Sequence, residues 1–180
     1  ELGQTISKER ILEEKNRRKF VRGVEILLFA AYLAVLCYFL FFAENLGRTF
    51  TEREYHYNLM PLKEIRRFIT YRHTLGFWSV SLNLAGNVVA FIPFGVFLPR
   101  LFPGCRKFFL TMLFGFEFSL CVELIQLVGK VGSFDVDDIL LNTMGGILGF
   151  CCYRVSVRLA RNRRSGDWSM EENDEKKKSL

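Results

Sequence analysis

The sequence has few of the residues and motifs on which soluble enzymes commonly depend. Only two of its 180 residues are His, and neither His56 nor His73 has a partner at motif spacing. None of the five cysteines forms a C-x-x-C motif or lies within metal-ligand spacing of a His, so we expect buried, small hydrophobic cysteines. There is no phosphate-binding loop and no nucleophile–His pair, which weighs against an enzymatic function.

The sequence also lacks a nucleic-acid-binding signature, although its formal charge is +6. No secretory signal peptide is readable, since the first apolar run begins near Val24 behind a charged segment. Half of the residues are hydrophobic, 19 are Phe, and long apolar runs alternate with basic clusters. Runs of this length are typical of bilayer-crossing helices. We therefore predict an integral membrane protein that contacts membrane lipids and binds no nucleic acid.

The predicted fold class is all-α, a polytopic membrane protein with four transmembrane helices. The spans are expected at about residues 24–43, 82–102, 108–128 and 139–157. Pro93 predicts a kink or a break in the second span.

The segments outside the spans are more polar. Leu62–Tyr71 has helical period, which predicts an amphipathic interfacial helix between the first and second spans. Residues 1–23 form a charged segment and residues 159–180 a basic, then disordered tail, flanking a membrane domain at 24–158. The dense basic residues of both ends predict cytoplasmic N- and C-termini in a multi-pass protein of the plasma membrane.

Polar side chains recur at one end of three predicted spans, at i,i+3 or i,i+4 spacing that places each pair on one helix face. With the acidic loop before the fourth span, they are expected to meet below the extracytoplasmic surface. We call this set the polar cluster: Asn83, Asn87, Glu123, Gln126, Asp135, Asp137, Asp138 and Asn142.

Two interpretations of the polar cluster remain open. Its members either join the helices by hydrogen bonds, or they form an outward-facing pocket for a lipid headgroup, a lipid-linked headgroup or a cation. Several adjacent carboxylates need a cation or a basic partner to stay ionised. A divalent cation is one alternative, although the D-V-D-D spacing departs from the calcium-loop pattern, and no cofactor is predicted. The alternative counter-charges are in the outer connection: Arg48, Arg53, Arg66 and Arg67.

Two further features of the spans carry predictions. Glu117 is expected near mid-bilayer, where a protonated carboxyl bonded to a neighbouring helix is favoured over a proton relay. Gly145 and Gly149 form a G-x-x-x-G motif, which in an apolar helix predicts close helix packing.

Several ungapped motifs resemble the VanZ-like family of bacterial membrane proteins. They are N-L-x-P with K-E-I (residues 58–65), N-L-x-G-N-x-x-x-F-I-P-F-G (83–95), E-L-I-Q (123–126) and F-D-V-D-D-I-L-L-N-T-x-G (134–145). The resemblance implies a connection with low-level resistance to teicoplanin, a lipoglycopeptide that acts on cell-wall precursors outside the membrane. It implies no established reaction.

We therefore expect a non-catalytic membrane protein that binds or excludes amphiphiles at the outer leaflet. The expected partners are membrane lipids and a lipoglycopeptide or a lipid-linked cell-wall precursor, with an effect on glycopeptide susceptibility or envelope homeostasis. One alternative is an enzyme acting on a lipid headgroup, with Asp135, Asp138 and Glu123 holding a metal or acting as base. The other is a structural membrane scaffold.

Overall fold

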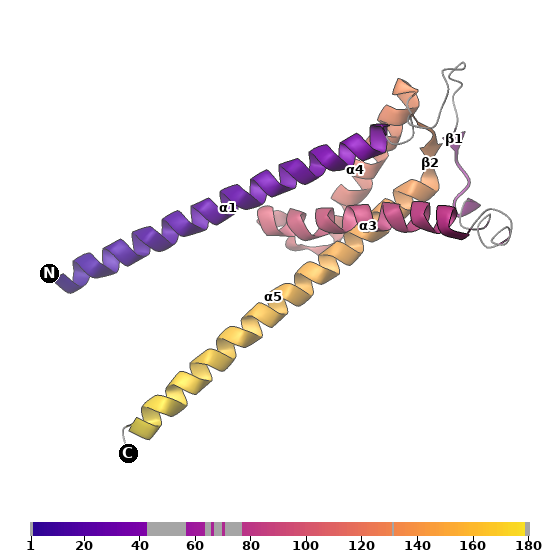
Figure 1. Ribbon diagram of the computed structural model, residues 1–180. Coiled ribbons are helices and arrows are strands. Elements are labelled where there is room, and N and C mark those ends of the chain that lie inside the picture. The colour runs from indigo at the N-terminus through magenta and orange to yellow at the C-terminus, as the bar shows by residue number, and fades with distance from the viewer. Residues whose placement is uncertain are drawn as a thin grey trace.

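The computed structural model describes residues 2–42, 57–63, 66, 70, 77–130 and 132–178. Helices dominate this part of the chain, and two short strands connect them at one end (Figure 1). The elements in order are α1 (Leu2–Phe42), β1 (Tyr57–Asn58), α3 (Phe77–Leu101), the 3-10 helix η2 (Pro103–Arg106), α4 (Phe108–Gly129), β2 (Phe134–Asp135) and α5 (Val136–Lys178).

Four of the described helices are long and apolar enough to cross a membrane. The candidate spans are Lys8–Phe41, Leu84–Leu101, Phe108–Gly129 and Val136–Arg163. The prediction of an all-α polytopic membrane protein is confirmed. Only 6% of the most apolar stretch of α1 is buried, against 39% for α5, so α5 is the more central helix and α1 leaves most of its apolar surface for lipid.

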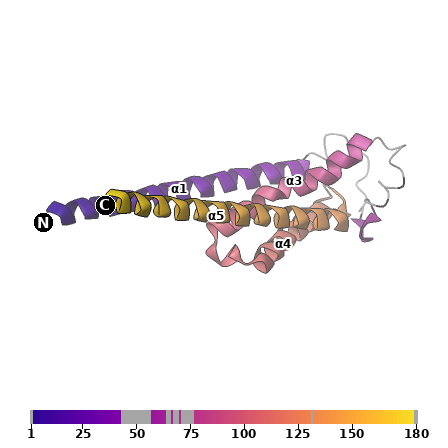
Figure 2. The same ribbon diagram turned by 90° about the horizontal axis from the view of Figure 1, so that it is seen from below.

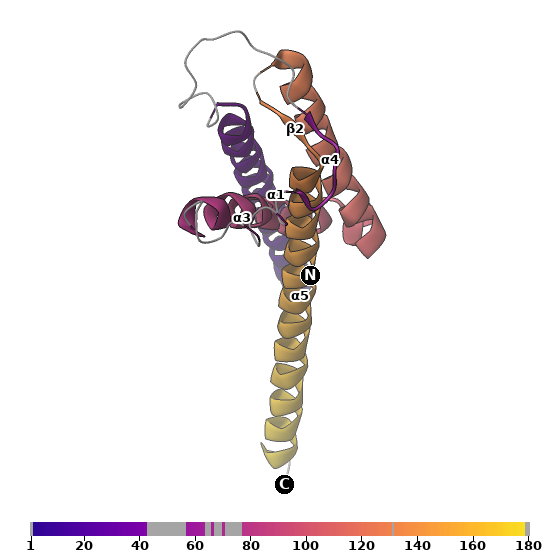
Figure 3. The same ribbon diagram turned by 90° about the vertical axis from the view of Figure 1, so that its right-hand side faces the viewer.

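The helices place the two ends of the chain on one side of the bundle. Figures 1 and 2 show α1 and α5 projecting in the same general direction, with both termini far from the two strands. At the opposite end, the strands lie beside the start of α5, as Figure 3 also shows. The end of α1, the start of α3, the end of α4 and the start of α5 therefore all lie toward the strand end.

Glycines allow α3 and α5 to cross with their backbones in contact. A Cβ added to Gly145 would lie 2.1 Å from the Val88 carbonyl oxygen, and one added to Gly149 would lie 2.0 Å from that of Ile92. On α3, a Cβ at Gly95 would lie 2.0 Å from the Gly146 carbonyl oxygen. No other residue type fits these distances without moving a helix, so the close packing predicted from G-x-x-x-G is confirmed.

Aromatic residues fill the space between α1, α3 and α4. Phe91 is fully buried, and Phe94 stacks on Phe118 of α4 with ring centroids 5.3 Å apart. On the α1 side, Tyr32 donates a hydrogen bond of 2.7 Å to the carbonyl oxygen of Ala90, in the turn that precedes Pro93. α3 continues as helix through Pro93, so the alternative of a break there is wrong. The carbonyl oxygen that loses its helical donor at Pro93 is that of Val89, so the Tyr32 bond joins α1 to α3 and does not replace the missing one.

The chain beyond the fourth span differs from its prediction. The tail was expected to be disordered, but α5 continues to Lys178. A helix that is already nucleated in the span extends at little cost, and residues 165–180 include three Glu and three Lys, which favour helix.

The interfacial helix predicted at Leu62–Tyr71 lies largely outside the described residues. Within them, Lys63, Arg66 and Thr70 are helical, and the Arg66 backbone N–H donates to the Leu62 carbonyl oxygen at 2.8 Å. The interfacial helix as a whole stays a prediction.

Candidate functional site

Asp135 ends the loop before α5 and serves as the N-cap of that helix. Its Oδ1 accepts a hydrogen bond of 2.8 Å from the backbone N–H of Asp137, which would otherwise have no intrahelical partner. Asp137 and Asp138 then occupy the first turn, where the helix dipole favours negative charge. The primary structural role of the D-V-D-D sequence is thus to cap and begin α5.

The same acidic turn holds part of the connection between α1 and α3. β1 pairs with β2 in parallel, with Asn58 opposite Asp135, and the Asn58 side-chain amide donates to Asp135 Oδ1 at 3.1 Å. Asp137 is 1% exposed and accepts a hydrogen bond from the backbone N–H of Leu62. Leu62 has a φ of 63°, a left-handed conformation that is unfavourable for a leucine and needs support from its surroundings. The carboxylate of Asp137 provides part of that support.

Two further bonds join the acidic turn to α3 and α4. The Asn87 side-chain amide donates to Asp138 Oδ1 at 2.5 Å, which links the first turns of α5 to α3. Glu123, 3% exposed on α4, accepts a bond of 2.9 Å from the backbone N–H of Asp135. Each of four acidic residues also makes a further interaction: Glu123, Asp135, Asp137 and Asp138.

Gln126 and Asn142 complete the described part of the polar cluster. Gln126 is 6% exposed and donates from Nε2 to the Leu40 carbonyl oxygen at 2.7 Å, close to the end of α1 where backbone carbonyls lack helical partners. Asn142 is 1% exposed and donates from Nδ2 to Ser119 Oγ at 2.9 Å. The opposite amide atoms, Gln126 Oε1 and Asn142 Oδ1, are buried and accept no hydrogen bond from the described residues.

The structure therefore brings seven of the eight polar-cluster residues to the strand end of the bundle. The eighth, Asn83, lies in α3, but its side chain is outside the part that the structure describes. Of the predicted counter-charges, Arg66 is exposed, while Arg48, Arg53 and Arg67 are outside the described residues. In the described part of the chain, no group of three or more His, Cys, Asp or Glu side chains is placed to hold a metal ion.

Comparison with known proteins identifies the chain. The family described as VanZ/LLP1 matches residues 29–158, which include the three apolar helices around the polar cluster and most of the apolar part of α1. The chain belongs to the VanZ/LLP1 family. It is 30% identical over 131 residues to Protein VanZ of Enterococcus faecium, with 72% of this chain and 73% of that protein covered. No solved structure matches the chain.

Sequence reasoning missed three contributors to the site of this VanZ/LLP1-family protein. They are the Asn58 side chain, the Leu62 backbone and the Ser119 hydroxyl. Asn58 belongs to the N-L-x-P motif of the family resemblance, so this motif could have indicated that Asn58 contributes to the site. A two-residue parallel strand pair has no periodicity to read, and a serine in a span resembles ordinary helix packing.

Glu117 corrects another prediction. It was expected to bond to a neighbouring helix, but it lies on the exposed side of α4 and its side chain makes no hydrogen bond with the described residues. Its helix position explains the difference, since the buried polar residues Ser119, Glu123 and Gln126 follow one another on the opposite face at helical spacing.

Proposed function

We propose that this protein acts in the bacterial plasma membrane, with both termini cytoplasmic, to reduce the effect of amphiphiles that reach the outer leaflet. The polar cluster would bind or exclude a lipid, a lipid-linked cell-wall precursor or a lipoglycopeptide of the teicoplanin type. Membership of the VanZ/LLP1 family supports this general role. The basic residues of both chain ends support the orientation, because Lys and Arg concentrate in cytoplasmic segments.

The observation that carries the proposal is the pair of buried carbonyl oxygens at Gln126 and Asn142. A buried acceptor without a donor costs about 1–3 kcal/mol, so such atoms are uncommon unless something else binds them. A hydroxyl or ammonium group of a sugar-rich headgroup is a suitable donor. Amphiphiles carry such groups at the depth where the polar cluster lies.

The surface of α4 beside Gln126 is apolar and suits the acyl chain of an amphiphile. Leu124, Ile125 and Val128 are 45%, 56% and 77% exposed, at the same end of the helix as the buried acceptors. An acyl chain lying on this surface would bring its polar headgroup to the depth of the polar cluster. A lipid-tailed glycopeptide combines both parts, and a glycopeptide without an acyl chain lacks one of them.

A structural scaffold is the second candidate, and a specific observation favours it. Asp135 caps α5, Asp137 holds Leu62 and Asp138 joins α3, so each acid of the turn has a structural use. An enzyme acting on a lipid headgroup stays a prediction without comparable support.

The test removes the Asn142 acceptor without leaving a new unpaired group. The double variant S119A/N142L replaces both partners of one buried hydrogen bond, a change that is close to neutral in stability. The matched control, Thr111→Val, removes one buried bond, to the Cys105 carbonyl oxygen, at the other end of α4. Each is expressed in a susceptible host, and inhibitory concentrations are measured for teicoplanin and for a glycopeptide without an acyl chain.

We expect S119A/N142L to lose protection against teicoplanin, while Thr111→Val keeps it and both proteins stay folded in detergent. Unchanged protection in S119A/N142L would contradict a binding role for this part of the polar cluster. Loss of protection in both variants, in proportion to their melting temperatures, would instead support the scaffold.

A further inference from the structure

The opposite end of the bundle carries a basic groove that the proposed function does not use. It encloses about 370 Å³, within the range of about 300–1,000 Å³ that is common for ligand pockets. Six residues line it: Arg106, Tyr153, Arg154, Val157, Arg158 and Arg161. We call this set the arginine groove. No acidic residue is among its lining residues.

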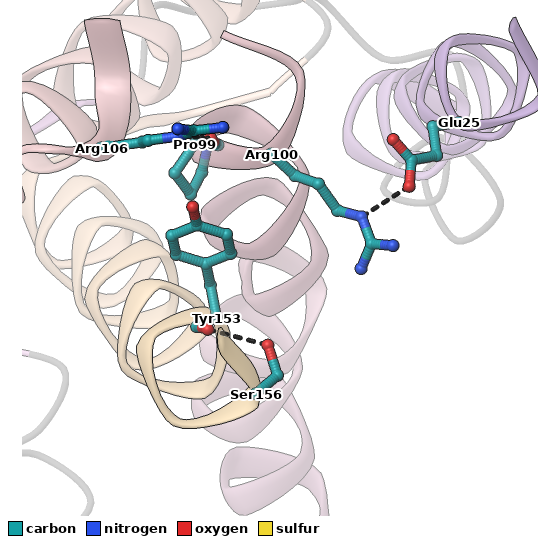
Figure 4. Close-up of polar contacts among 6 residues, drawn as sticks. All are labelled: Glu25, Pro99, Arg100, Arg106, Tyr153 and Ser156. Atoms are coloured by element: carbon teal, nitrogen blue, oxygen red, sulfur yellow. Dashed lines mark hydrogen bonds and ion pairs between the residues drawn. The ribbon is translucent and has the colours of Figure 1, made fainter. Parts of the chain in front are cut away.

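Two elements build the arginine groove. Arg154, Arg158 and Arg161 follow one another at i,i+4 and i,i+3 spacing, so α5 presents them on one face. Arg106 comes from the turn between α3 and α4, where its Nε donates to the Pro99 carbonyl oxygen at 3.4 Å. Figure 4 shows the Tyr153 hydroxyl pointing toward Pro99 and the Arg106 side chain. Arginines from two elements thus line the groove, and the buried Tyr153 forms part of its wall.

The neighbouring ion pair shows that the arginine groove is a separate feature. At the same end of the bundle, Arg100 donates to Glu25 of α1 at 2.6 Å, and Figure 4 shows this pair directed away from Tyr153. Glu25 is thus engaged by Arg100, which does not line the groove.

The depth of the arginine groove fits a lipid headgroup. The chain turns between the end of α3 at Leu101 and the start of α4 at Phe108, so this turn marks the membrane boundary on this side. Phe102 and Phe109, 52% and 71% exposed, flank the turn and offer apolar surface to acyl chains. Arginine binds phosphate oxygens through two parallel N–H donors, and basic pockets at this level of a membrane protein typically hold anionic headgroups.

From this geometry we propose that the arginine groove binds the phosphate of an anionic phospholipid, in the leaflet on the side of the two chain termini. A phosphatidylglycerol or cardiolipin headgroup has the required charge. The site is independent of the polar cluster, which lies at the other end of the helices.

The test uses the full chain, purified and placed in nanodiscs of phosphatidylcholine with or without phosphatidylglycerol or cardiolipin. Lipid retained by the protein is measured by native mass spectrometry. The variant R154Q/R158Q removes two groove charges but keeps good helix formers. The matched control R10Q/R17Q removes two exposed charges from α1, on the same side of the bundle, and leaves the groove intact.

We expect R154Q/R158Q to bind the anionic lipid at least about tenfold more weakly, which is about 1.4 kcal/mol, and R10Q/R17Q to bind it like the parent. R154K/R158K, which keeps the charges and loses the paired donors, should fall between them and should melt like the parent without lipid. Equal weakening in R154Q/R158Q and R10Q/R17Q would overturn the proposal in favour of unspecific surface charge. Competition by inorganic phosphate at equal concentration would overturn the lipid assignment in favour of a soluble anion.

Discussion

Two adjacent glycines of α5 should respond in opposite ways to the same substitution. A Cβ at Gly145 would lie 2.1 Å from the Val88 carbonyl oxygen and 2.9 Å from the Phe91 Cβ, whereas a Cβ at Gly146 meets nothing within 4 Å. The atoms at Gly145 are backbone or close to it, so no flexible side chain can move aside. Ordinary van der Waals contact begins at 3.4 Å, so the two helices would have to separate by well over 1 Å to restore it.

The expected magnitudes follow from two opposing effects. Alanine favours helix over glycine by about 0.5–1 kcal/mol at either position. Overpacking at Gly145 costs about 1–3 kcal/mol, and the upper part of this range applies because the clash is with backbone. We therefore expect Gly145→Ala to lower the free energy of unfolding by about 1–2 kcal/mol and Gly146→Ala to raise it by up to about 1 kcal/mol.

Reversible unfolding in mixed detergent micelles, followed by circular dichroism, measures both values under one condition. The comparison is internal, because the two variants share composition, helix and membrane depth. Equal stability of Gly145→Ala and Gly146→Ala would refute the close α3–α5 crossing. Since apolar burial does not drive helix association within lipid, the contacts made at this crossing are a main source of its stability.

Three further predictions concern single polar contacts and use the same unfolding measurement. Asp135→Ala should lower stability by about 0.5–2 kcal/mol by removing the α5 N-cap, while Asp135→Asn, which keeps an acceptor, should lose less; equal losses would contradict the capping role. Tyr32→Phe should cost about 0.6 kcal/mol, the average for a hydrogen bond between membrane helices, and no loss would show that the Ala90 carbonyl is satisfied without it. A double-mutant cycle of Glu25→Gln and Arg100→Gln should give a coupling below about 1 kcal/mol that decreases with salt, because the Arg100 side chain is about half exposed; coupling that does not change with salt would contradict this.

The sequence was sufficient to predict the helices and the end at which polar residues gather, because both depend on patterns that repeat along the chain. Apolar runs predict spans, and i,i+3 or i,i+4 polar pairs predict one face near one end. The contacts of Asn58 and Leu62 depend instead on how a distant segment folds back onto α5, and no local pattern encodes that. The exposed position of Glu117 likewise depends on which face of α4 turns inward. A lone carboxyl in an apolar run does not reveal it.

The acids that first suggested a cation site have a simpler primary explanation in the structure. Asp135, Asp137 and Asp138 lie at the start of α5, and their partners include a backbone amide of that helix, the Leu62 backbone and the Asn87 side chain. Negative charge at a helix N-terminus is favourable without any bound cation. The density of carboxylates therefore no longer argues for a ligand by itself.

The feature that structural hydrogen bonds do not explain is in the side-chain amides of the polar cluster and not in its carboxylates. Gln126 and Asn142 each use their N–H groups to join two helices, and each leaves a carbonyl oxygen buried without a donor in the described part of the chain. If these amides served only to join helices, replacing each hydrogen-bonded pair with apolar residues would be expected to stabilise the protein. Replacing both partners of a buried hydrogen bond is close to neutral in stability, whereas keeping a buried carbonyl oxygen without a donor is costly. These carbonyl oxygens would accept hydrogen bonds from O–H or N–H groups that are neutral or positively charged. The ligand chemistry expected at the polar cluster is therefore that of hydroxyl and ammonium groups, which distinguishes it from the phosphate chemistry expected at the arginine groove.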